Sequence, residues 1–314
     1  MTKHTLLMDC DPGQDDAIAL MMALAMPEAI ELCAVTTVAG NVPLDKTTAN
    51  ARRILDLLGR DDIRVHAGCA RPILRTPMHA EHVHGVDGLV GVGLPPPSRA
   101  ADDGHAVDVL IAEVDDRPAG TVTLAATGPL TNVALALIKA PEFGQRLQRI
   151  VLMGGSSGVG NVSPAAEFNI FADPHAAAVV FASGVEIVML PLDATHQVIV
   201  TAERHQAVRA LGGRLAEVAA DLIDPTTWFE RDRFVEPGAP LHDPCVIAWL
   251  LAPELFGGKE VHVAVETAPG PCFGATVCDL YAVSGQAANA RLIDKVDAPG
   301  VFRLLLECLM RCQK

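Results

Sequence analysis

The chain has 314 residues, of which 50% are hydrophobic, and its 24 basic and 38 acidic residues give a formal charge of −14. This length can bury a large core, and the acidic balance argues against nucleic acid or an anionic membrane as the main partner. The eight cysteines lie mostly within apolar runs and form no Cys-x-x-Cys pair, which is typical of reduced thiols in a cytoplasmic protein. We expect neither a signal peptide nor a transmembrane helix, because acidic residues begin at Asp9 and the longest apolar run is too short to cross a bilayer.

Strand-like and helix-like segments alternate through the first two thirds of the chain. Strands are predicted at 5–8, 31–38, 63–67, 121–126, 149–153 and 186–190. Helices are predicted between them at 17–26, 44–58, 106–114, 131–139 and 175–182. This repeated β-α order predicts an α/β fold with a mostly parallel central sheet and helices on both of its faces.

The pattern changes near residue 201. Consecutive helical segments are predicted over 201–224, and a stretch with proline, glycine and aromatic residues follows over 225–240. Beyond it, helices are predicted at 244–251 and 299–312 and strands at 261–266 and 276–280. Because no repeat or low-complexity linker interrupts the chain, we expect a single domain, 1–314, with a helical insertion near residues 201–240.

Four aspartates, Asp9, Asp11, Asp15 and Asp16, lie between the first predicted strand and the first predicted helix. This position is the carboxyl end of a strand, where ligand sites form in open α/β sheets. A helix N-cap and a solvated acidic turn would account for Asp15 or Asp16 but not for Asp9 and Asp11. Carboxylates this crowded are costly to ionise together without a cation, and hard oxygen ligands favour Ca²⁺ or Mg²⁺ over Zn²⁺. The motif therefore predicts a cation site.

Polar groups also follow later predicted strands. Asn41 follows Ala39-Gly40, Thr127 precedes Gly128-Pro129, and Met153 precedes two glycines. Each of these alone is compatible with an ordinary polar loop. Because the carboxyl ends of parallel strands share one edge of a sheet, together they predict the rim of a single crevice.

A loop after these strands contains Asn161, Glu167, Phe168 and Asn169. Amides and a carboxylate around one aromatic ring would suit a polyhydroxylated ligand such as a sugar. The alternative is a solvated loop in which the asparagines cap helices.

The segment His242-Asp243-Pro244 precedes an apolar helix. Asp243 is a candidate N-cap, with Pro244 at the first helical position, and its carboxylate would also be able to reach a metal ion. His242 is compatible either with a chemical role or with a satisfied core histidine.

With these motifs in order, the chain resembles the Ca²⁺-dependent nucleoside hydrolases, often called inosine/uridine-preferring. The landmarks span roughly residues 5 to 300, and the opening acidic motif is highly specific. They are Asp9-Cys10-Asp11-Pro12-Gly13-Gln14-Asp15-Asp16-Ala17, Gly40-Asn41, Ala126-Thr127-Gly128-Pro129-Leu130-Thr131-Asn132, Met153-Gly154-Gly155, Glu167-Phe168-Asn169 and His242-Asp243-Pro244.

The resemblance implies a Rossmann-like nucleoside hydrolase fold and hydrolysis of the N-glycosidic bond of ribonucleosides to free base and ribose. By this resemblance Asp11, Asp16, Asp243 and the carbonyl of Thr127 hold Ca²⁺, and the ribose 2′- and 3′-hydroxyls complete its ligand shell. Asp11 would also be the general base that deprotonates a Ca²⁺-bound water. His242 matches the group that protonates or stabilises the departing base.

The resemblance also implies a set of substrate contacts. Those to the sugar would be Asp15 and Asn169 at the 2′- and 3′-hydroxyls, Asn161 and Glu167 at the 5′-hydroxyl, and Asn41 and Met153 in the rest of the ribose pocket. His84 would border the base pocket, Phe229 lies in an aromatic stretch that would stack on the base, and Phe168 is a further predicted substrate contact. The stretch around Phe229 keeps aromatic rings but has no tyrosine, and Tyr281 is the only tyrosine of the chain. His242 nevertheless favours pyrimidine or mixed substrates (uridine, cytidine, inosine) over purines alone.

The family likeness further implies a homodimer or homotetramer and a role in nucleoside salvage, with a small-molecule ribonucleoside as the partner. Two alternatives come from other classes of protein. A Mg²⁺-dependent phosphatase of the haloacid dehalogenase type also places Asp-x-Asp after its first strand, but it leaves Asp15, Asp16 and the His242-Asp243 pair unexplained. The other is a non-catalytic Ca²⁺-stabilised protein that binds sugars or nucleosides.

Overall fold

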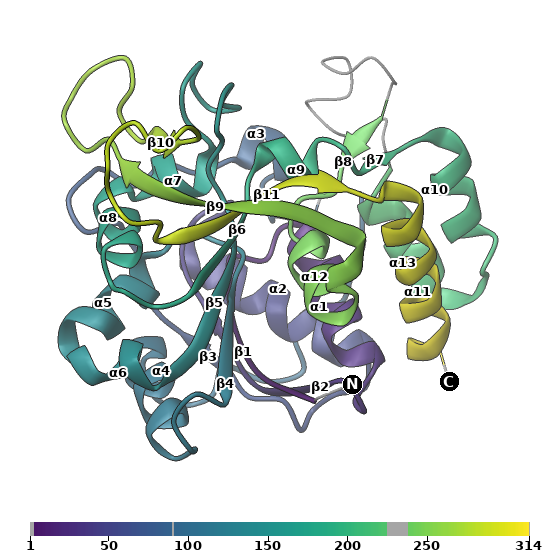
Figure 1. Cartoon of the computed structure of the whole chain (residues 1–314). Helices are drawn as coiled ribbons and strands as arrows, with labels where there is room; N and C mark the ends of the chain where they lie inside the picture. Colours follow the sequence, from purple (N-terminus) through teal and green to yellow (C-terminus); the bar gives the residue numbers. More distant parts are fainter. Residues whose placement is uncertain (1–2, 90, 225–237, 314) are drawn as a thin grey trace.

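A computed structural model describes residues 3–89, 91–224 and 238–313. Its centre is a nine-stranded sheet in the order β10-β9-β11-β6-β5-β4-β1-β2-β3 (Figure 1). In this order, the seven strands from β11 to β3 are parallel to one another. β9 pairs antiparallel with β11, and β10 pairs antiparallel with β9. The strands are β1 (His4–Cys10), β2 (Ile30–Thr37), β3 (Val65–Ala67), β4 (Val122–Ala126), β5 (Leu147–Met153), β6 (Ile187–Leu190), β9 (Phe256–Val265), β10 (Thr276–Asp279) and β11 (Ala290–Val296). The predicted, mostly parallel central sheet is confirmed.

Helices cover both faces of the sheet (Figure 1). One face packs against α1 (Gln14–Ala25), α2 (Leu44–Leu57), α10 (Ala202–Arg209), α11 (Gly213–Leu222), α12 (Pro244–Leu251) and α13 (Ala298–Cys312). The other packs against α4 (Ala106–Asp115), α5 (Thr131–Lys139), α6 (Pro141–Arg146) and α8 (Pro174–Phe181). The two-helix segment α10–α11 matches the predicted helical insertion as far as residue 224.

Short elements complete the described chain. They are α3 (Glu81–His84), α7 (Phe168–Ala172), α9 (Leu192–Thr195), the 3-10 turn η1 (Pro253–Leu255) and a separate two-stranded ladder of β7 (Ile199–Val200) and β8 (Ala239–Pro240). Within the described residues, no helix is both long and apolar enough to cross a membrane. All eight cysteines have free thiols, as their scattered spacing predicts.

The hydrophobic pattern of β1 explains why this strand lies in the middle of the sheet. Leu6 and Met8 pack into the core on the side of α1, and Leu7 packs into the core on the side of α5. All three side chains are at most 1% exposed. A strand that is apolar on both faces is stable only where helices cover both faces, which is the environment of parallel sheets.

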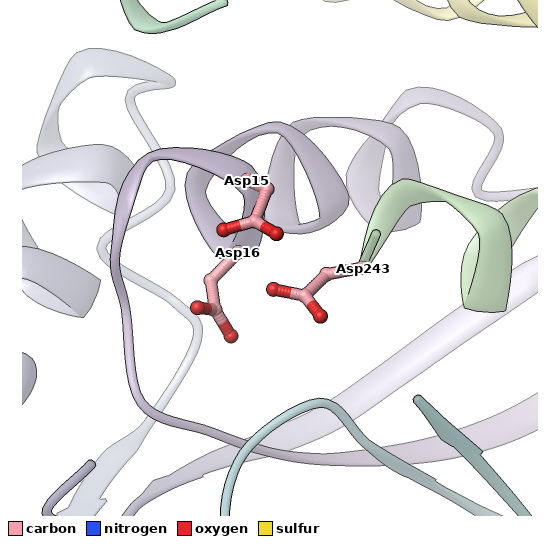
Figure 2. Close-up of side chains that lie close together, drawn as sticks. All are labelled: Asp15, Asp16 and Asp243. Atoms are coloured by element: carbon pink, nitrogen blue, oxygen red, sulfur yellow. The ribbon is translucent and has the colours of Figure 1, made fainter. Parts of the chain in front are cut away.

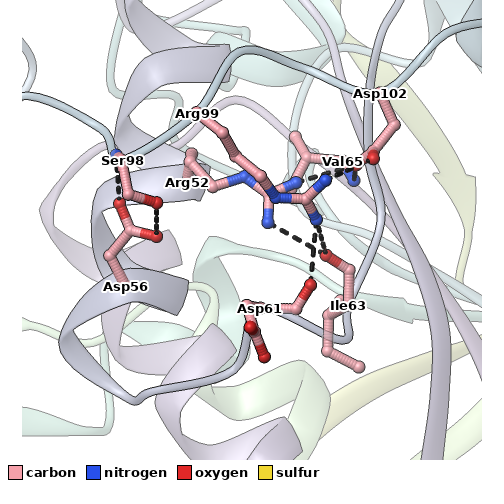
Figure 3. Close-up of polar contacts among 8 residues, drawn as sticks. All are labelled: Arg52, Asp56, Asp61, Ile63, Val65, Ser98, Arg99 and Asp102. Atoms are coloured by element: carbon pink, nitrogen blue, oxygen red, sulfur yellow. Dashed lines mark hydrogen bonds and ion pairs between the residues drawn. The ribbon is translucent and has the colours of Figure 1, made fainter.

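An ionic network protects the exposed edge of the sheet at β3 (Figure 3). Asp102 accepts a hydrogen bond from the backbone N–H of Val65, and its own N–H donates to the carbonyl of Val65. The buried guanidinium of Arg52 on α2 binds the same carboxylate at 2.8 Å and the carbonyl of Ile63 at 3.1 Å. The segment that contains Asp102 therefore covers an edge that would otherwise present unpaired backbone groups.

Two strands of the central sheet in the C-terminal half depart from the prediction. The segment of β11 was assigned no structure, and β9 begins at Phe256 rather than at residue 261. β11 has a register shift between Ile293 and Lys295, which breaks the alternation of apolar and polar residues that identifies a strand. The start of β9 contains Gly258, whose position lets its backbone approach the carbonyl of Leu292 closely.

Candidate active site

The carboxyl ends of the parallel strands place the acidic motif at one edge of the sheet. Cys10 of β1 pairs with Thr37 of β2, and Ala126 of β4 pairs with Leu152 of β5, so the loops that follow these four strands begin side by side. The turn after β1 carries Asp11 and leads directly into α1. The convergence predicted from the sequence is therefore present.

Three buried carboxylates meet at this edge. Asp15 and Asp16 belong to the first turn of α1, and Asp243 is the residue that precedes α12. Figure 2 shows their side chains turned toward one another, and one ligand atom from each lies within 4.8 Å of the others. Asp243 makes no side-chain capping hydrogen bond to α12, so its carboxylate is not used as a helix cap.

Asp11 and Asp16 are held by their surroundings in different ways. One oxygen of Asp16 accepts the Thr127 hydroxyl at 2.7 Å, and the other accepts the N–H of Gly13 and the side-chain amide of Asn41. Asp11 accepts the backbone N–H of Asn41 at 2.6 Å through Oδ2. Its Oδ1 is buried and has no hydrogen-bond partner within the described part of the chain.

Burial and mutual repulsion set the electrostatics of the cluster. Burial, followed by the charge of Asp16, raises the pKa of Asp11 well above its ordinary range. Burial, followed by the charges of Asp15 and Asp16, does the same to the pKa of Asp243. The pKa of Asp16 is raised to about 7, first by burial and then by Asp15. Buried carboxylates with raised pKa values and an unpaired oxygen form a donor set that suits a hard divalent cation.

The cation-binding set predicted from the family likeness differs from this group in one member. The carboxylates that converge are those of Asp15, Asp16 and Asp243, whereas the predicted set contains Asp11 in place of Asp15. The carbonyl of Thr127, also predicted as a ligand, accepts the side-chain amide of Asn169 at 2.7 Å. The ligand set therefore stays a prediction.

Asp9, the first aspartate of the motif, is not among the carboxylates that converge. Its Oδ1 accepts the hydroxyl of Thr36 at 2.6 Å and the amide of Asn132 at 2.8 Å. Asn132 also donates to the carbonyl of Thr37, so the residue joins three parts of the structure. Burial raises the pKa of Asp9 to about 7.

A cavity opens above the acidic cluster. Its lining contains eleven of the residues predicted as site residues, namely Asp15, Asn41, His84, Thr127, Met153, Asn161, Glu167, Phe168, Asn169, His242 and Asp243. Asp11 and Asp16 are fully buried and do not line the cavity. Phe229 lies outside the described residues. The lining also includes four residues that were not predicted, Ala80, His82, Val83 and Val162, which belong to the α3 region and to the loop after Asn161.

Glu167 organises the polar loop of the cavity. Its carboxylate accepts the backbone N–H groups of Gly155, Asn169 and Ile170, so the glutamate caps α7 and ties it to the loop after β5. Asn161 accepts the N–H of Phe168 at 3.0 Å. The loop is therefore a hydrogen-bonded structure rather than a solvated one.

Three histidines line the cavity, namely His82, His84 and His242. His242 is 9% exposed, and its Nδ1 lies 2.9 Å from the hydroxyl of Thr195. The ring of His196 packs edge-on against that of His242, with centroids 5.7 Å apart. Burial lowers the pKa of His84, and the nearby charge of Asp15 acts in the opposite direction. The lowered pKa favours a neutral imidazole at His84, which is suited to hydrogen-bonding a bound group.

Comparison with known proteins identifies the class to which this fold and site belong. The family model described as inosine-uridine preferring nucleoside hydrolase matches residues 6–303. The chain is 47% identical to the pyrimidine-specific ribonucleoside hydrolase RihA of Shewanella baltica, over 98% of this chain and 96% of the relative. It is 46% identical to RihA of Citrobacter koseri, over 97% of each. The structure of a purine-preferring ribonucleoside hydrolase from Gardnerella vaginalis matches with a TM-score of 0.90 and 31% identity, over 98% of each chain.

The chain belongs to the inosine-uridine preferring nucleoside hydrolase family. It is an enzyme that cleaves the N-glycosidic bond of ribonucleosides by hydrolysis. This family assignment excludes the two alternatives that the sequence left open, a haloacid dehalogenase-type phosphatase and a non-catalytic binding protein.

Proposed function

We propose that this enzyme hydrolyses uridine, cytidine and inosine, with a pyrimidine or mixed preference, and that Ca²⁺ is its cofactor. The observation that carries the proposal is the buried group of Asp15, Asp16 and Asp243 beside a cavity lined by amides and histidines. A ribose diol and a hard cation both require oxygen ligands, and a departing base requires a hydrogen-bond donor. These two requirements match the two kinds of residue at the cavity.

The proposed Ca²⁺ ligands are Asp11, Asp16, Asp243 and the carbonyl of Thr127. Support comes from the oxygen-only donor set and from the buried Oδ1 of Asp11, which lacks a partner within the described residues. The pKa values of Asp11, Asp16 and Asp243 give further support, because burial and then mutual repulsion raise them and a bound cation would offset both effects. When bound, Ca²⁺ would hold the ribose diol and make a water molecule more acidic.

Asp11 is the proposed general base. It takes a proton from the attacking water while the water oxygen bonds to C1′ and the C1′–N bond breaks, with its electron pair passing to the base. Positive charge develops on the ribose during this step, and the carboxylates around the site stabilise it. His242 stabilises the negative charge that develops on the base, and His84 borders the same part of the cavity.

The hydrogen bonds of Glu167 are compatible with a proposed contact to the ribose. Asp15 and Asn169 would bind the 2′- and 3′-hydroxyls, and Asn161 and Glu167 the 5′-hydroxyl. A carboxylate has about four acceptor positions, and three backbone N–H groups occupy positions on Glu167. One position is left for a hydroxyl. Asn41, Met153 and Phe168 would complete the pocket around the sugar and base, with Phe229 as a further proposed contact to the base.

The base preference is supported by the relatives. The two RihA enzymes, at 46% and 47% identity, carry pyrimidine-specific names. The purine-preferring structure from Gardnerella vaginalis shares only 31% of its sequence with this chain. The presence of His242 at the cavity is consistent with the pyrimidine or mixed preference.

We also propose that residues 1–314 form one domain, that the enzyme is a homodimer or homotetramer, and that it is cytoplasmic. The single nine-stranded sheet, which takes strands from both ends of the chain, supports the first proposal. The eight free thiols support a reducing compartment. Light scattering coupled to size-exclusion chromatography tests the oligomeric state, and a monomer would contradict it.

The proposal is tested by measuring ribose release from uridine, cytidine, inosine and adenosine after chelation, and again after adding back Ca²⁺ or Mg²⁺. We expect the chelator to abolish ribose release, Ca²⁺ to restore it better than Mg²⁺, and a pyrimidine nucleoside to be the best substrate. Turnover that survives complete metal removal would contradict the cofactor proposal. A strong preference for adenosine would contradict the base preference alone.

A further inference from the structure

The neighbour of His242 is a buried hydroxyl from a distant part of the sequence. Thr195 is the last residue of α9, it is 0% exposed, and its Oγ1 lies 2.9 Å from Nδ1 of His242. This is the hydrogen bond that orients one edge of the imidazole. His242 also lines the cavity, so the ring extends from Thr195 to the site.

The hydrogen-bond geometry determines which of the two atoms donates. Within the described residues, Nδ1 of His242 is the only hydrogen-bond partner of the Thr195 hydroxyl. If Nδ1–H donated to this hydroxyl, the buried O–H of Thr195 would have no acceptor. If the hydroxyl donates, both groups are satisfied, and only an unused lone pair remains on the oxygen. Leaving a buried donor unpaired is the more costly arrangement, so the neutral ring carries its proton on Nε2.

The backbone holds the two residues in this arrangement from both sides. The N–H of Leu241 donates to the carbonyl of Val198 at 2.9 Å. Leu241 directly precedes His242, and Val198 lies three residues after Thr195. The ladder of β7 and β8 continues this pairing away from the site. Gly238 packs so closely that an added Cβ would lie 2.5 Å from the carbonyl oxygen of Val200. The hydroxyl and the imidazole are therefore positioned by paired strands.

The other end of α9 is also fastened to the site. The N–H of Leu192 donates to the carbonyl of Gly155, in the loop that Glu167 holds. Asp193 accepts both the N–H and the hydroxyl of Ser157. Thr195 thus sits on a short helix whose position is coupled to the proposed ribose-binding loop.

We propose that Thr195 is a positioning residue that fixes His242 as a neutral hydrogen-bond donor through Nε2. The inference rests on the proposed function of His242. The ring donates a hydrogen bond, without transferring its proton, to the base as this takes up the electron pair of the C1′–N bond. The proton of the attacking water passes to Asp11, and the departing base is protonated later by solvent. A donor held in one tautomer needs no reorganisation during the reaction.

The test compares two leaving groups with the Thr195→Val enzyme, in which the side chain keeps its shape but loses its hydroxyl. Uracil leaves poorly from uridine and needs the hydrogen bond, whereas the 4-nitrophenolate of 4-nitrophenyl β-D-ribofuranoside leaves without such help. We expect kcat for uridine to fall about 10- to 100-fold, at the low end of effects for proton-handling groups, with KM nearly unchanged. Hydrolysis of the nitrophenyl riboside should stay within about twofold, and Thr195→Ser should restore uridine turnover.

A matched control and a double variant separate positioning from damage to the fold. Thr123 is also a buried threonine with one side-chain hydrogen bond, to Gln148, and Thr123→Val should leave both reactions unchanged. Adding Thr195→Val to His242→Ala should cause no further loss for uridine, because the two residues act through one group. Equal losses on both substrates, or no loss on uridine, would overturn the inference.

If the wild-type enzyme hydrolyses no nucleoside, the proposed function fails, and the tautomer can still be measured. In ¹⁵N spectra of histidine-labelled protein, assigned with His242→Ala, Nδ1 of His242 should have the shift of an unprotonated nitrogen and Nε2 that of a protonated one. The Thr195→Val protein should lose this pattern. The opposite tautomer in the wild-type protein would overturn the inference independently of activity.

Discussion

Asp11 has two oxygens in different environments. Oδ2 accepts the N–H of Asn41, while Oδ1 is buried without a partner in the described parts of the chain. An asparagine keeps the size and the acceptor for Asn41 but removes the negative charge and the proposed base. We expect Asp11→Asn to lower kcat at least about 10²- to 10⁴-fold and to leave the fold intact, measured by ribose release from uridine and by circular dichroism.

Asp108 supplies the control for this variant. It is an exposed aspartate on α4, paired with Lys139, and it does not line the cavity. Asp108→Asn removes the same charge and should not change turnover. An Asp11→Asn enzyme that retains near-native turnover would exclude Asp11 as the base.

Individual site residues could be predicted from the sequence where they directly follow a predicted strand, because that position places them at the edge of the sheet where the site forms. Asp11, Asn41 and Thr127 each follow a parallel strand, and such strand ends meet at one edge. Thr195 could not be predicted, because its contact with His242 spans 47 positions and its helix has only four residues. A helix this short has no periodicity to detect. His82 was missed for the same reason, since α3 is equally short.

The turns after β2 and β4 show how neighbouring loops are fitted around one carboxylate. A Cβ on Gly40 would lie 2.0 Å from Oδ2 of Asp11 and 2.7 Å from Cδ of Pro129. A Cβ on Gly128 would lie 2.5 Å from Oδ1 of Asp11. Both glycines are needed because the backbone approaches the carboxylate, and no conformational preference of glycine is involved.

We expect Gly40→Ala to reduce both stability and activity, because the added methyl group overlaps with Asp11 and with the β4 loop. The free energy of unfolding should fall by about 1–3 kcal/mol, as for other overpacked sites, measured by urea denaturation. Gly270 has no atom within 4 Å of its Cβ position, so Gly270→Ala is the matched control and should change neither property. A Gly40→Ala enzyme with unchanged stability and turnover would show that the loops can separate without cost.

At the level of elements, the sequence predicted the parallel strands and most of the flanking helices, since their apolar runs and helical periods are long. It failed at β11, where the register shift interrupts the alternation, and at the first residues of β9, which include two glycines. Glycine is uncommon in strands, and only the pairing with β11 makes these residues part of the sheet.

The acidic cluster couples the stability of the whole molecule to pH and to Ca²⁺. The pKa of Asp16 is raised to about 7 in the fold from an ordinary value of 3.8, and those of Asp11 and Asp243 are raised as well. Between about pH 4 and pH 7, the metal-free fold therefore binds protons that the unfolded chain does not. The free energy of unfolding of the metal-free protein should fall as pH rises through this range.

Ca²⁺ should reverse this loss, because it binds the deprotonated carboxylates. At a Ca²⁺ concentration of about 100 times Kd, the stabilisation should be about 2.7 kcal/mol near pH 8, and it should shrink toward pH 5. Thermal denaturation with and without a chelator across this range measures both effects. A Ca²⁺-dependent shift of Tm that is independent of pH would contradict the coupling, and Asp11→Asn should weaken it.

The position of β11 in the sheet has a consequence for synthesis of the chain. β11 lies between β6 and β9, yet about 100 residues separate the end of β6 at Leu190 from the start of β11 at Ala290. At the usual elongation rates of about 5–20 residues per second, the edge of β6 stays unpaired for roughly 5–20 s before β11 is synthesised. The nascent chain therefore carries an open, apolar strand edge until residues 290–296 have been synthesised. Loss of the last 25 residues, which include β11, would leave that edge open permanently and favour aggregation.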